Sequence, residues 1–114
     1  MEYRKLGRTG YEISNLSFGT MELRLLDTAH AGRILNEALD RGVNYIDTSP
    51  EYPMSEYFIG QGIAHRRSEY ILATKCGDNM TGIGPLYRFD RKTILDNLDE
   101  SLRLMKTDYI DVWQ

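Results

Sequence analysis

The chain has 114 residues, a formal net charge of −3 and a single cysteine, Cys76. This length allows one domain with a modest core, and no basic run offers a footprint for nucleic acid. No apolar run approaches the ~18–20 residues of a membrane span, and the N-terminus lacks the apolar stretch of a signal peptide. These features predict a cytoplasmic protein without a nucleic-acid partner or membrane contact.

Two short runs around a glycine-bounded turn open the chain. Glu2–Lys5 and Tyr11–Ser14 flank Leu6–Gly10, a pattern typical of a β-hairpin. The next run, Leu16–Gly19, predicts a short strand whose final glycine lets the backbone turn or lets a ligand come close. A Gly-Thr pair such as Gly19-Thr20 is usually only a turn, so it is weak evidence for a site by itself.

A helix with marked ends follows. Asp27 or Thr28 can cap its start, and Gly42 suits the position just past its end. His30 lies near the start of the helix, and we expect it to be a surface or boundary histidine rather than a catalyst. The predicted buried stripe has helical spacing and comprises Ala31, Ile34, Leu35, Ala38 and Leu39.

The centre of the chain combines a strand end with polar residues. Tyr45-Ile46 predicts the end of a buried strand, and the run from Asp47 to Pro50 breaks it, so that Asp47 and Tyr52 stand on a loop. Ser55 can cap a second helix. The apolar side of that helix comprises Phe58, Ile59, Gly62 and Ile63, with Arg66 and Arg67 near its C-terminus.

A third strand, Tyr70–Thr74, leads into Lys75. The following segment, Cys76–Phe89, is too rich in glycine and asparagine to be regular, and it either shapes a substrate pocket or is mobile. Asp90 can cap a third helix. Its predicted buried face comprises Ile94, Leu95, Leu98, Leu102 and Met105.

A fourth strand is predicted at Tyr109–Trp113 and contains an acid, Asp111, within an apolar run. We expect Asp111 to be paired inside the fold rather than to act at the rim. Thr20, Asp47 and Lys75 recur at intervals close to the ~30 residues of a βα unit, which predicts an α/β fold with a parallel sheet. Catalytic groups lie at the C-terminal ends of such strands, where all three residues fall.

Several of these motifs occur in the order found in a known family. Gly42–Ser49, then Tyr52, then Ser55-Glu56, then Ala73-Thr74-Lys75 resemble the N-terminal half of an aldo-keto reductase, and the likeness extends over nearly the whole chain. The resemblance implies a partial TIM (β/α)8 barrel, in which an N-terminal hairpin precedes four parallel strands and three helices. A complete barrel needs ~250 residues. Residues 1–114 are therefore expected to be a single, incomplete domain.

The resemblance also implies a function. It predicts an NAD(P)H-dependent oxidoreductase that reduces aldehydes or ketones to alcohols by hydride transfer, with NADPH as cofactor, NADH as an alternative and no metal. Tyr52 would be the general acid, Lys75 would tune it, and Asp47 would hold Lys75 and lie near the cofactor ribose. Gly19, Thr20 and Met21 would face the nicotinamide end of the cofactor.

These roles agree with the chemistry of the residue types. Tyrosine has a free pKa of ~10 and is a sluggish proton donor near neutrality, but an adjacent ammonium stabilises the phenolate and lowers that value. Each residue alone has an ordinary structural explanation, since aspartates cap helices, tyrosines pack and lysines are solvated. The combination in this order, at matching strand ends, favours the reductase.

Two departures from the family pattern matter. Pro53-Met54 follows Tyr52 where the family often has glycine, which fixes the backbone there and removes one donor. The family's catalytic histidine follows its fourth strand in a Gln-Leu-His context, whereas this sequence stops at Gln114, and neither His30 nor His65 matches that motif. The main cofactor-anchoring segments of the family also come from later strands.

We therefore expect the 114-residue chain to be inactive alone and to need further strands. It would self-associate or pair with a complementary C-terminal half, because its edge strands and the inward side chains Phe18, Ile46, Leu72 and Trp113 would lack the opposite wall. The alternative is a non-catalytic half-barrel interaction module or a truncated, inactive reductase.

Overall fold

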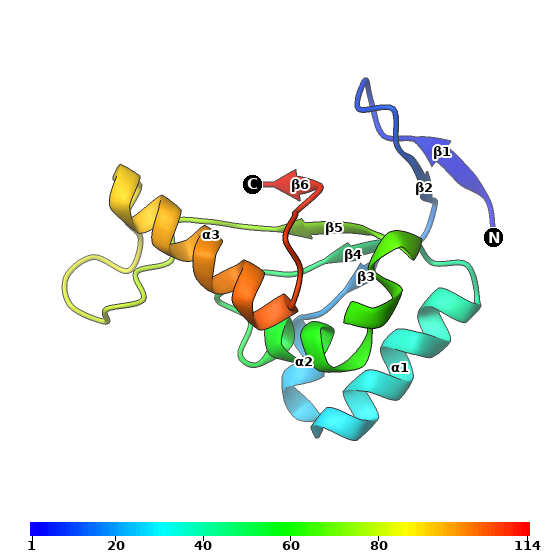
Figure 1. Ribbon diagram of the computed structural model, residues 1–114, viewed down its shortest axis with the longest axis horizontal. Coiled ribbons are helices and arrows are strands. Elements are labelled where there is room, and N and C mark those ends of the chain that lie inside the picture. The colour runs from blue at the N-terminus through cyan, green and yellow to red at the C-terminus, as the bar shows by residue number, and fades with distance from the viewer.

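The computed structural model describes residues 1–114 and contains a hairpin, a parallel sheet and a layer of helices (Figure 1). The hairpin pairs β1 (Tyr3–Lys5) with β2 (Glu12–Ser14). The strands of the four-stranded sheet follow one another in chain order, and each pair of neighbouring strands is parallel. It comprises β3 (Phe18–Gly19), β4 (Tyr45–Asp47), β5 (Ile71–Thr74) and β6 (Val112–Trp113).

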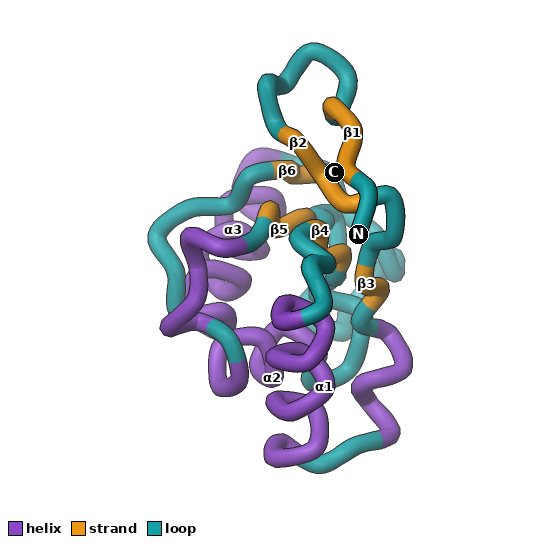
Figure 2. Tube along the Cα trace, turned by 90° about the vertical axis from the view of Figure 1, so that its right-hand side faces the viewer, coloured by secondary structure: helices purple, strands orange, loops and turns teal.

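The helices connect successive strands and lie on one side of the parallel sheet (Figure 2). They are the 3-10 helix η1 (Met21–Leu25), α1 (Thr28–Asp40), α2 (Ser55–Gly62), the 3-10 helix η2 (Ala64–Glu69) and α3 (Arg91–Met105). This repeated strand–helix order is the expected partial barrel. None of the helices is both long and apolar enough to cross a membrane.

The ends of α1 and α3 confirm the sequence prediction. The carboxylate of Asp27 accepts a hydrogen bond from the backbone N–H of His30 at 2.8 Å, and that of Asp90 accepts from Thr93 at 3.1 Å. Gly42 follows α1 with a φ of 88°, in the left-handed region that suits glycine.

The prediction that Ser55 caps α2 is wrong. The cap is Met54, which has a φ of 64° and makes no side-chain capping bond. The hydroxyl of Ser55 instead donates to the carbonyl oxygen of Thr20 at 2.8 Å, in a buried contact with the end of β3. The Pro53-Met54 turn thus supplies the helix start, and the serine side chain ties the helix to the sheet.

The core lies between the helix layer and the sheet. Phe18, Ile46 and Leu72 lie side by side in the registers of β3, β4 and β5. Eleven buried residues form the core cluster, against which Phe18 packs: Leu23, Ala31, Leu35, Leu39, Ile46, Phe58, Ile59, Ile63, Tyr70, Leu72 and Met105. The helices therefore cover this face of the sheet.

The expectation that Phe18, Ile46, Leu72 and Trp113 point into the barrel is consequently wrong. Side chains alternate between the faces of a strand, so with Asp47 on the inner face, Ile46 must face the helices. Paired residues share a face, which places Phe18 and Leu72 with it. Trp113 pairs with Thr74 and lines a hollow against α3, on the same helical side.

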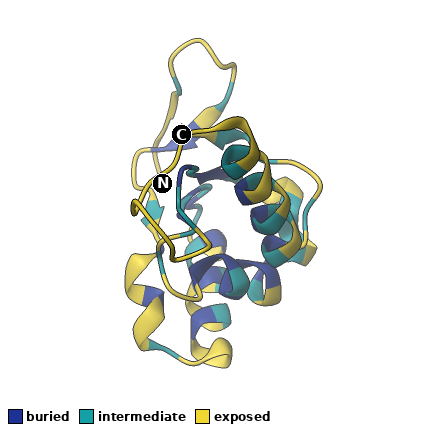
Figure 3. Ribbon diagram, turned by 90° about the vertical axis from the view of Figure 1, so that its left-hand side faces the viewer, coloured by how far each residue is buried: buried dark blue, intermediate teal, exposed yellow.

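Figure 3 shows buried and exposed residues on the helices, and two of the predicted buried faces need correction. Ile34 of α1 and Leu95 of α3 are exposed. The deeply buried residues of α3 are Asn97, Ser101 and Met105. Two of these residues are polar, and hydrogen bonds account for their burial. The side-chain oxygen of Asn97 accepts from the backbone N–H of Gly77, and the hydroxyl of Ser101 donates to a carboxylate of α2.

The fourth strand is shorter than predicted. Only Val112 and Trp113 are in β6, because the carboxylate of Asp111, rather than a backbone carbonyl, accepts from the N–H of Leu72 at 2.8 Å. Asp111 also forms an ion pair with Arg67 at 2.6 Å. The expectation that Asp111 is paired inside the fold is confirmed.

Candidate active site

The parallel sheet brings Asp47 and Lys75 together at the C-terminal ends of neighbouring strands. Asp47 ends β4, and Lys75 follows the last residue of β5. The ammonium of Lys75 donates to Oδ2 of Asp47 at 3.0 Å and to the carbonyl oxygen of Thr48 at 2.8 Å. Two acceptors therefore fix the position of this cation at the rim.

Tyr52 lies on the loop before α2 and completes the cluster. The ammonium of Lys75 lies 5.0 Å from the centroid of the Tyr52 ring, within the range of a cation–π contact. The loop is tight, because the backbone N–H of Tyr52 donates to Ser49 at 3.1 Å and the carbonyl of Tyr52 accepts from Ser55 at 3.0 Å. The lysine thus contacts the face of the ring and makes no hydrogen bond with its hydroxyl.

The predicted cofactor residues follow β3 beside this cluster. Gly19 pairs with Asp47 in the sheet, and a Cβ added to Gly19 would meet nothing within 4 Å. Met21 is exposed at the same rim, whereas Thr20 is fully buried. The backbone N–H and the hydroxyl of Thr20 both donate to the carbonyl of Asp47, at 3.0 and 3.1 Å. The space over Gly19 is therefore open, while Thr20 holds the backbone of Asp47.

Sequence reasoning missed Gln114 as a member of this cluster. Its side-chain amide donates to Oδ1 of Asp47 at 3.1 Å, so both carboxylate oxygens of Asp47 have a partner. The register gives the signal that could have identified it, because Gln114 follows β6, which pairs with the strand that ends before Lys75. A polar residue at that strand end points to the same rim.

Glu56, which the sequence shows only as part of the Ser55-Glu56 motif, is buried beside the site. Its carboxylate accepts from the hydroxyls of Thr74 and Ser101. Burial raises the pKa of Glu56, while those two hydroxyl donors act in the opposite direction. In the sequence, Glu56 lies between the predicted cap Ser55 and the apolar residues of the helix, and this position does not indicate that its side chain is buried.

The segment Cys76–Phe89 folds back beside Lys75. A bridge joins Asp78 to Tyr87, and a hollow of about 200 Å³ lies against the lysine. It is lined by Ser49, Pro50, Glu51, Lys75, Cys76, Asp78, Tyr87 and Phe89. Burial, with the nearby Glu51 carboxylate, raises the pKa of Asp78. Of the two expectations for this segment, a pocket-shaping role fits its position.

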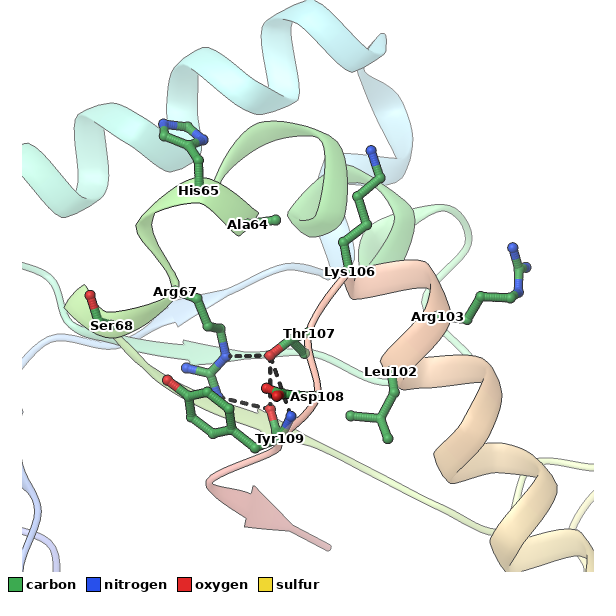
Figure 4. Close-up of a pocket in the computed structure, with 10 residues that line it drawn as sticks. All are labelled: Ala64, His65, Arg67, Ser68, Leu102, Arg103, Lys106, Thr107, Asp108 and Tyr109. Carbon is green, nitrogen blue, oxygen red and sulfur yellow. Dashed lines mark hydrogen bonds between the residues drawn. The ribbon is translucent and has the colours of Figure 1, made fainter.

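A larger cavity, of about 710 Å³, lies elsewhere (Figure 4). It is lined by residues of η2, of the last turn of α3 and of the segment that leads to β6, so it lies at the opposite end of the strands from Lys75. There the guanidinium of Arg67 donates hydrogen bonds to Thr107 Oγ1 and to the carbonyl of Tyr109. Size alone therefore does not identify the site. No group of three or more His, Cys, Asp or Glu side chains is arranged to hold a metal ion.

Comparison with known proteins agrees with this geometry. The profile of the Aldo/keto reductase family matches residues 15–114. The uncharacterised oxidoreductase YqkF of Bacillus subtilis is 36% identical over 118 residues, covering 100% of this chain and 38% of that protein. The L-galactose dehydrogenase of Arabidopsis thaliana is 36% identical over 123 residues, covering 98% and 37%.

A solved structure shows the same relation. The holo form of the aldo-keto reductase AKR11C1 from Bacillus halodurans matches with a TM-score of 0.88 and 37% identity, covering 100% of this chain and 39% of that one. The chain therefore belongs to the aldo-keto reductase family, and its strands and helices form part of a TIM barrel. It spans about two fifths of the length of these relatives.

Proposed function

We propose that this chain supplies Asp47, Tyr52 and Lys75 to the active site of an oxidoreductase that reduces aldehydes or ketones to alcohols with NAD(P)H. The observation that carries the proposal is the Lys75 ammonium, held by Asp47 and Thr48 and lying 5.0 Å from the Tyr52 ring. Membership of the aldo-keto reductase family supports it.

The proposed chemistry divides into hydride and proton transfer. The nicotinamide cofactor supplies the hydride that reaches the carbonyl carbon. Tyr52 donates its phenolic proton to the carbonyl oxygen as charge develops there, which gives the alcohol. Lys75 stabilises the phenolate that remains, and Asp47 holds Lys75 while balancing its charge.

The cofactor would lie over the ends of β3 and β4. Gly19 would leave room for it, the exposed Met21 would lie beside it, and Thr20 would act by holding Asp47, which would lie toward the ribose. NADPH is the proposed cofactor and NADH the alternative. The contacts that anchor the rest of the cofactor would come from other strands of the barrel.

Residues 1–114 would act as one incomplete domain of this enzyme. The remaining strands would come from a longer chain, from a complementary C-terminal half, or in part from a second copy. The proposed substrate is a small carbonyl compound. A single cysteine and a surface of mixed charge support a cytoplasmic location.

The test uses a complete barrel that contains these residues. It is incubated with an aldehyde and with NADPH or NADH deuterated at C4 of the nicotinamide, with each of the two C4 positions labelled in turn. We expect the alcohol carbon to gain one deuterium, and Lys75→Met to slow the reaction by roughly 10²-fold or more. Lys5→Met in the exposed hairpin is the matched control and should leave the rate unchanged. No transfer of deuterium from either cofactor would refute the proposal.

A further inference from the structure

Glu56 is a buried acid that the proposed chemistry does not use. It is the second residue of α2, and its exposed fraction is 3%. No lysine, arginine or histidine forms an ion pair with it. Burial of an unpaired carboxylate is costly, so a fold that retains one needs well-placed hydrogen-bond donors.

The two donors to Glu56 come from different elements. The hydroxyl of Thr74, the last residue of β5, donates to Oε1 at 2.7 Å. The hydroxyl of Ser101, on α3, lies 2.9 Å from Oε1 and 3.1 Å from Oε2. One carboxylate thus joins the start of α2 to both β5 and α3.

Thr74 is the residue directly before Lys75. A displacement of the end of β5 would therefore carry Lys75 away from Asp47 and the carbonyl of Thr48. Ser55 directly precedes Glu56, and the hydroxyl of Ser55 donates to the carbonyl of Thr20. Two consecutive residues at the start of α2 therefore hold the ends of β3 and β5.

The turn that carries Tyr52 leads into the same helix start. Met54 has a φ of 64°, which is unfavourable for a residue with a side chain and persists only where neighbouring contacts enforce it. The buried bonds of Ser55 and Glu56 are the contacts that follow directly in the chain.

We propose that Glu56 is a positioning residue, which acts through Thr74 to hold Lys75 at its distance from Tyr52. The inference rests on the proposed function, because it assigns Glu56 to the same reaction. A merely structural Glu56 would stabilise the packing of α2, β5 and α3 equally through both of its donors.

The two donors allow a matched test in the complete barrel. Thr74→Val keeps the shape and removes the donor next to Lys75, Thr74→Ser keeps the donor, and Ser101→Ala removes the remote donor. We expect Thr74→Val to lower kcat by at least about tenfold with KM nearly unchanged, since small displacements of catalytic groups are costly. Thr74→Ser and Ser101→Ala should stay within about threefold of the parent. Thermal unfolding of each variant separates loss of rate from loss of fold, and Thr74→Ala replaces the valine variant if that fails to fold.

Equal losses of kcat in Thr74→Val and Ser101→Ala, or no loss in either, would overturn the proposal. Crystal structures of the same variants give a second readout that needs no turnover. In Thr74→Val the Lys75 ammonium should leave Asp47 and the Thr48 carbonyl, whereas in Ser101→Ala it should stay. An unmoved Lys75 in both variants would also overturn the inference. If the parent protein reduces no carbonyl compound, the proposed function fails, while the crystal structures still decide whether Glu56 positions Lys75.

Discussion

Arg67 and Asp111 form the least exposed ion pair of the chain, with 10% and 8% of their side chains exposed. Arg67 also donates to the carbonyls of Tyr70 and Tyr109, and its guanidinium lies 3.8 Å from the centroid of the Tyr109 ring. These contacts join η2 to the segment before β6. The ion pair therefore holds these segments together at the end of the sheet opposite the candidate active site.

Removal of one partner should leave the other charge buried and unpaired. We expect Asp111→Ala to lower the free energy of unfolding by roughly 3–5 kcal/mol. Asp108→Ala, at an exposed position nearby, should change it by less than about 0.5 kcal/mol. Urea unfolding of the complete barrel with each substitution measures both values. Equal effects of the two substitutions would show that the ion pair has no special role.

At the scale of single residues, the sequence predicted Asp111 better than its partner. An acid within an apolar run indicates a paired carboxylate, but Arg67 lies 44 positions earlier in the chain. The same limit applies to Glu56 and Ser101, which lie 45 positions apart. Local patterns identify a group that needs a partner, whereas the choice of partner depends on how the helices pack on the sheet.

At the scale of elements, two glycines of α2 allow the helices to approach closely. A Cβ added to Gly60 would lie 2.0 Å from the carbonyl oxygen of Leu104 on α3. A Cβ added to Gly62 would lie 2.8 Å from the Cα of Gly32 on α1. Both neighbours are backbone atoms, which cannot rotate away. The packing of the helix layer therefore depends on the absence of these side chains.

Gly60→Ala should force α2 and α3 apart and lower the free energy of unfolding by roughly 1–3 kcal/mol or more. Gly32→Ala is the control, because its Cβ would meet Gly62 at 3.5 Å, an ordinary contact. In a helix that substitution should stabilise by about 0.5–1 kcal/mol. Urea unfolding gives both values, and a tolerated Gly60→Ala would contradict this account of the packing.

The order of the strands and of the three α-helices followed from the sequence, but η1, η2 and one buried face did not. The prediction that Arg66 and Arg67 lie near the C-terminus of α2 is wrong, because α2 ends at Gly62 and both arginines lie in η2. Helix capping and periodicity predicted the start of α3 at Asp90 and an apolar stripe. The structure buries Asn97 and Ser101 instead of Leu95, because the side-chain amide oxygen of Asn97 accepts from the backbone N–H of Gly77 and the hydroxyl of Ser101 donates to Glu56. Hydrophobic periodicity cannot identify a helix face whose burial depends on hydrogen bonds.

At the scale of the whole molecule, the sheet has two free edges, β3 and β6. The chain exposes 6872 Å², against roughly 6,400 Å² for a compact protein of its mass. Next to the β6 edge, the apolar side chains of Leu98, Leu102 and Trp113 line an open hollow. The helix-covered face is well packed, so the exposed apolar surface lies mainly at the edges and loops.

We expect the isolated 114-residue chain to self-associate or to be only marginally folded. At about 25 cal/mol per Å², a few hundred Å² of wet apolar surface amounts to several kcal/mol, comparable with the stability of a small domain. Light scattering at micromolar concentration, together with thermal unfolding, measures both properties. A monodisperse monomer with a sharp, cooperative transition well above ~65 °C would contradict the expectation.

The same isolated chain should show little or no reductase activity. The family resemblance implies a histidine donor that these residues do not supply, and the loss of one such donor costs roughly 10²–10³ in rate. The proposed contacts that anchor the rest of the cofactor would also come from other strands of the barrel. The measurement is NADPH oxidation by the purified chain with a reactive aldehyde. Substantial oxidation that Tyr52→Phe abolishes would refute this prediction.

Tyr52 is the proposed proton donor in carbonyl reduction, and the kcat of a Tyr52→Phe variant tests this role. Phenylalanine keeps the ring beside Lys75 and removes the phenolic hydroxyl with its proton, so the complete barrel should lose about 10²-fold or more in kcat while it binds NADPH unchanged. Tyr57→Phe, on α2, is the control and should keep the parent kcat. A Tyr52→Phe variant that reduces aldehydes as fast as the Tyr57→Phe variant would contradict this role.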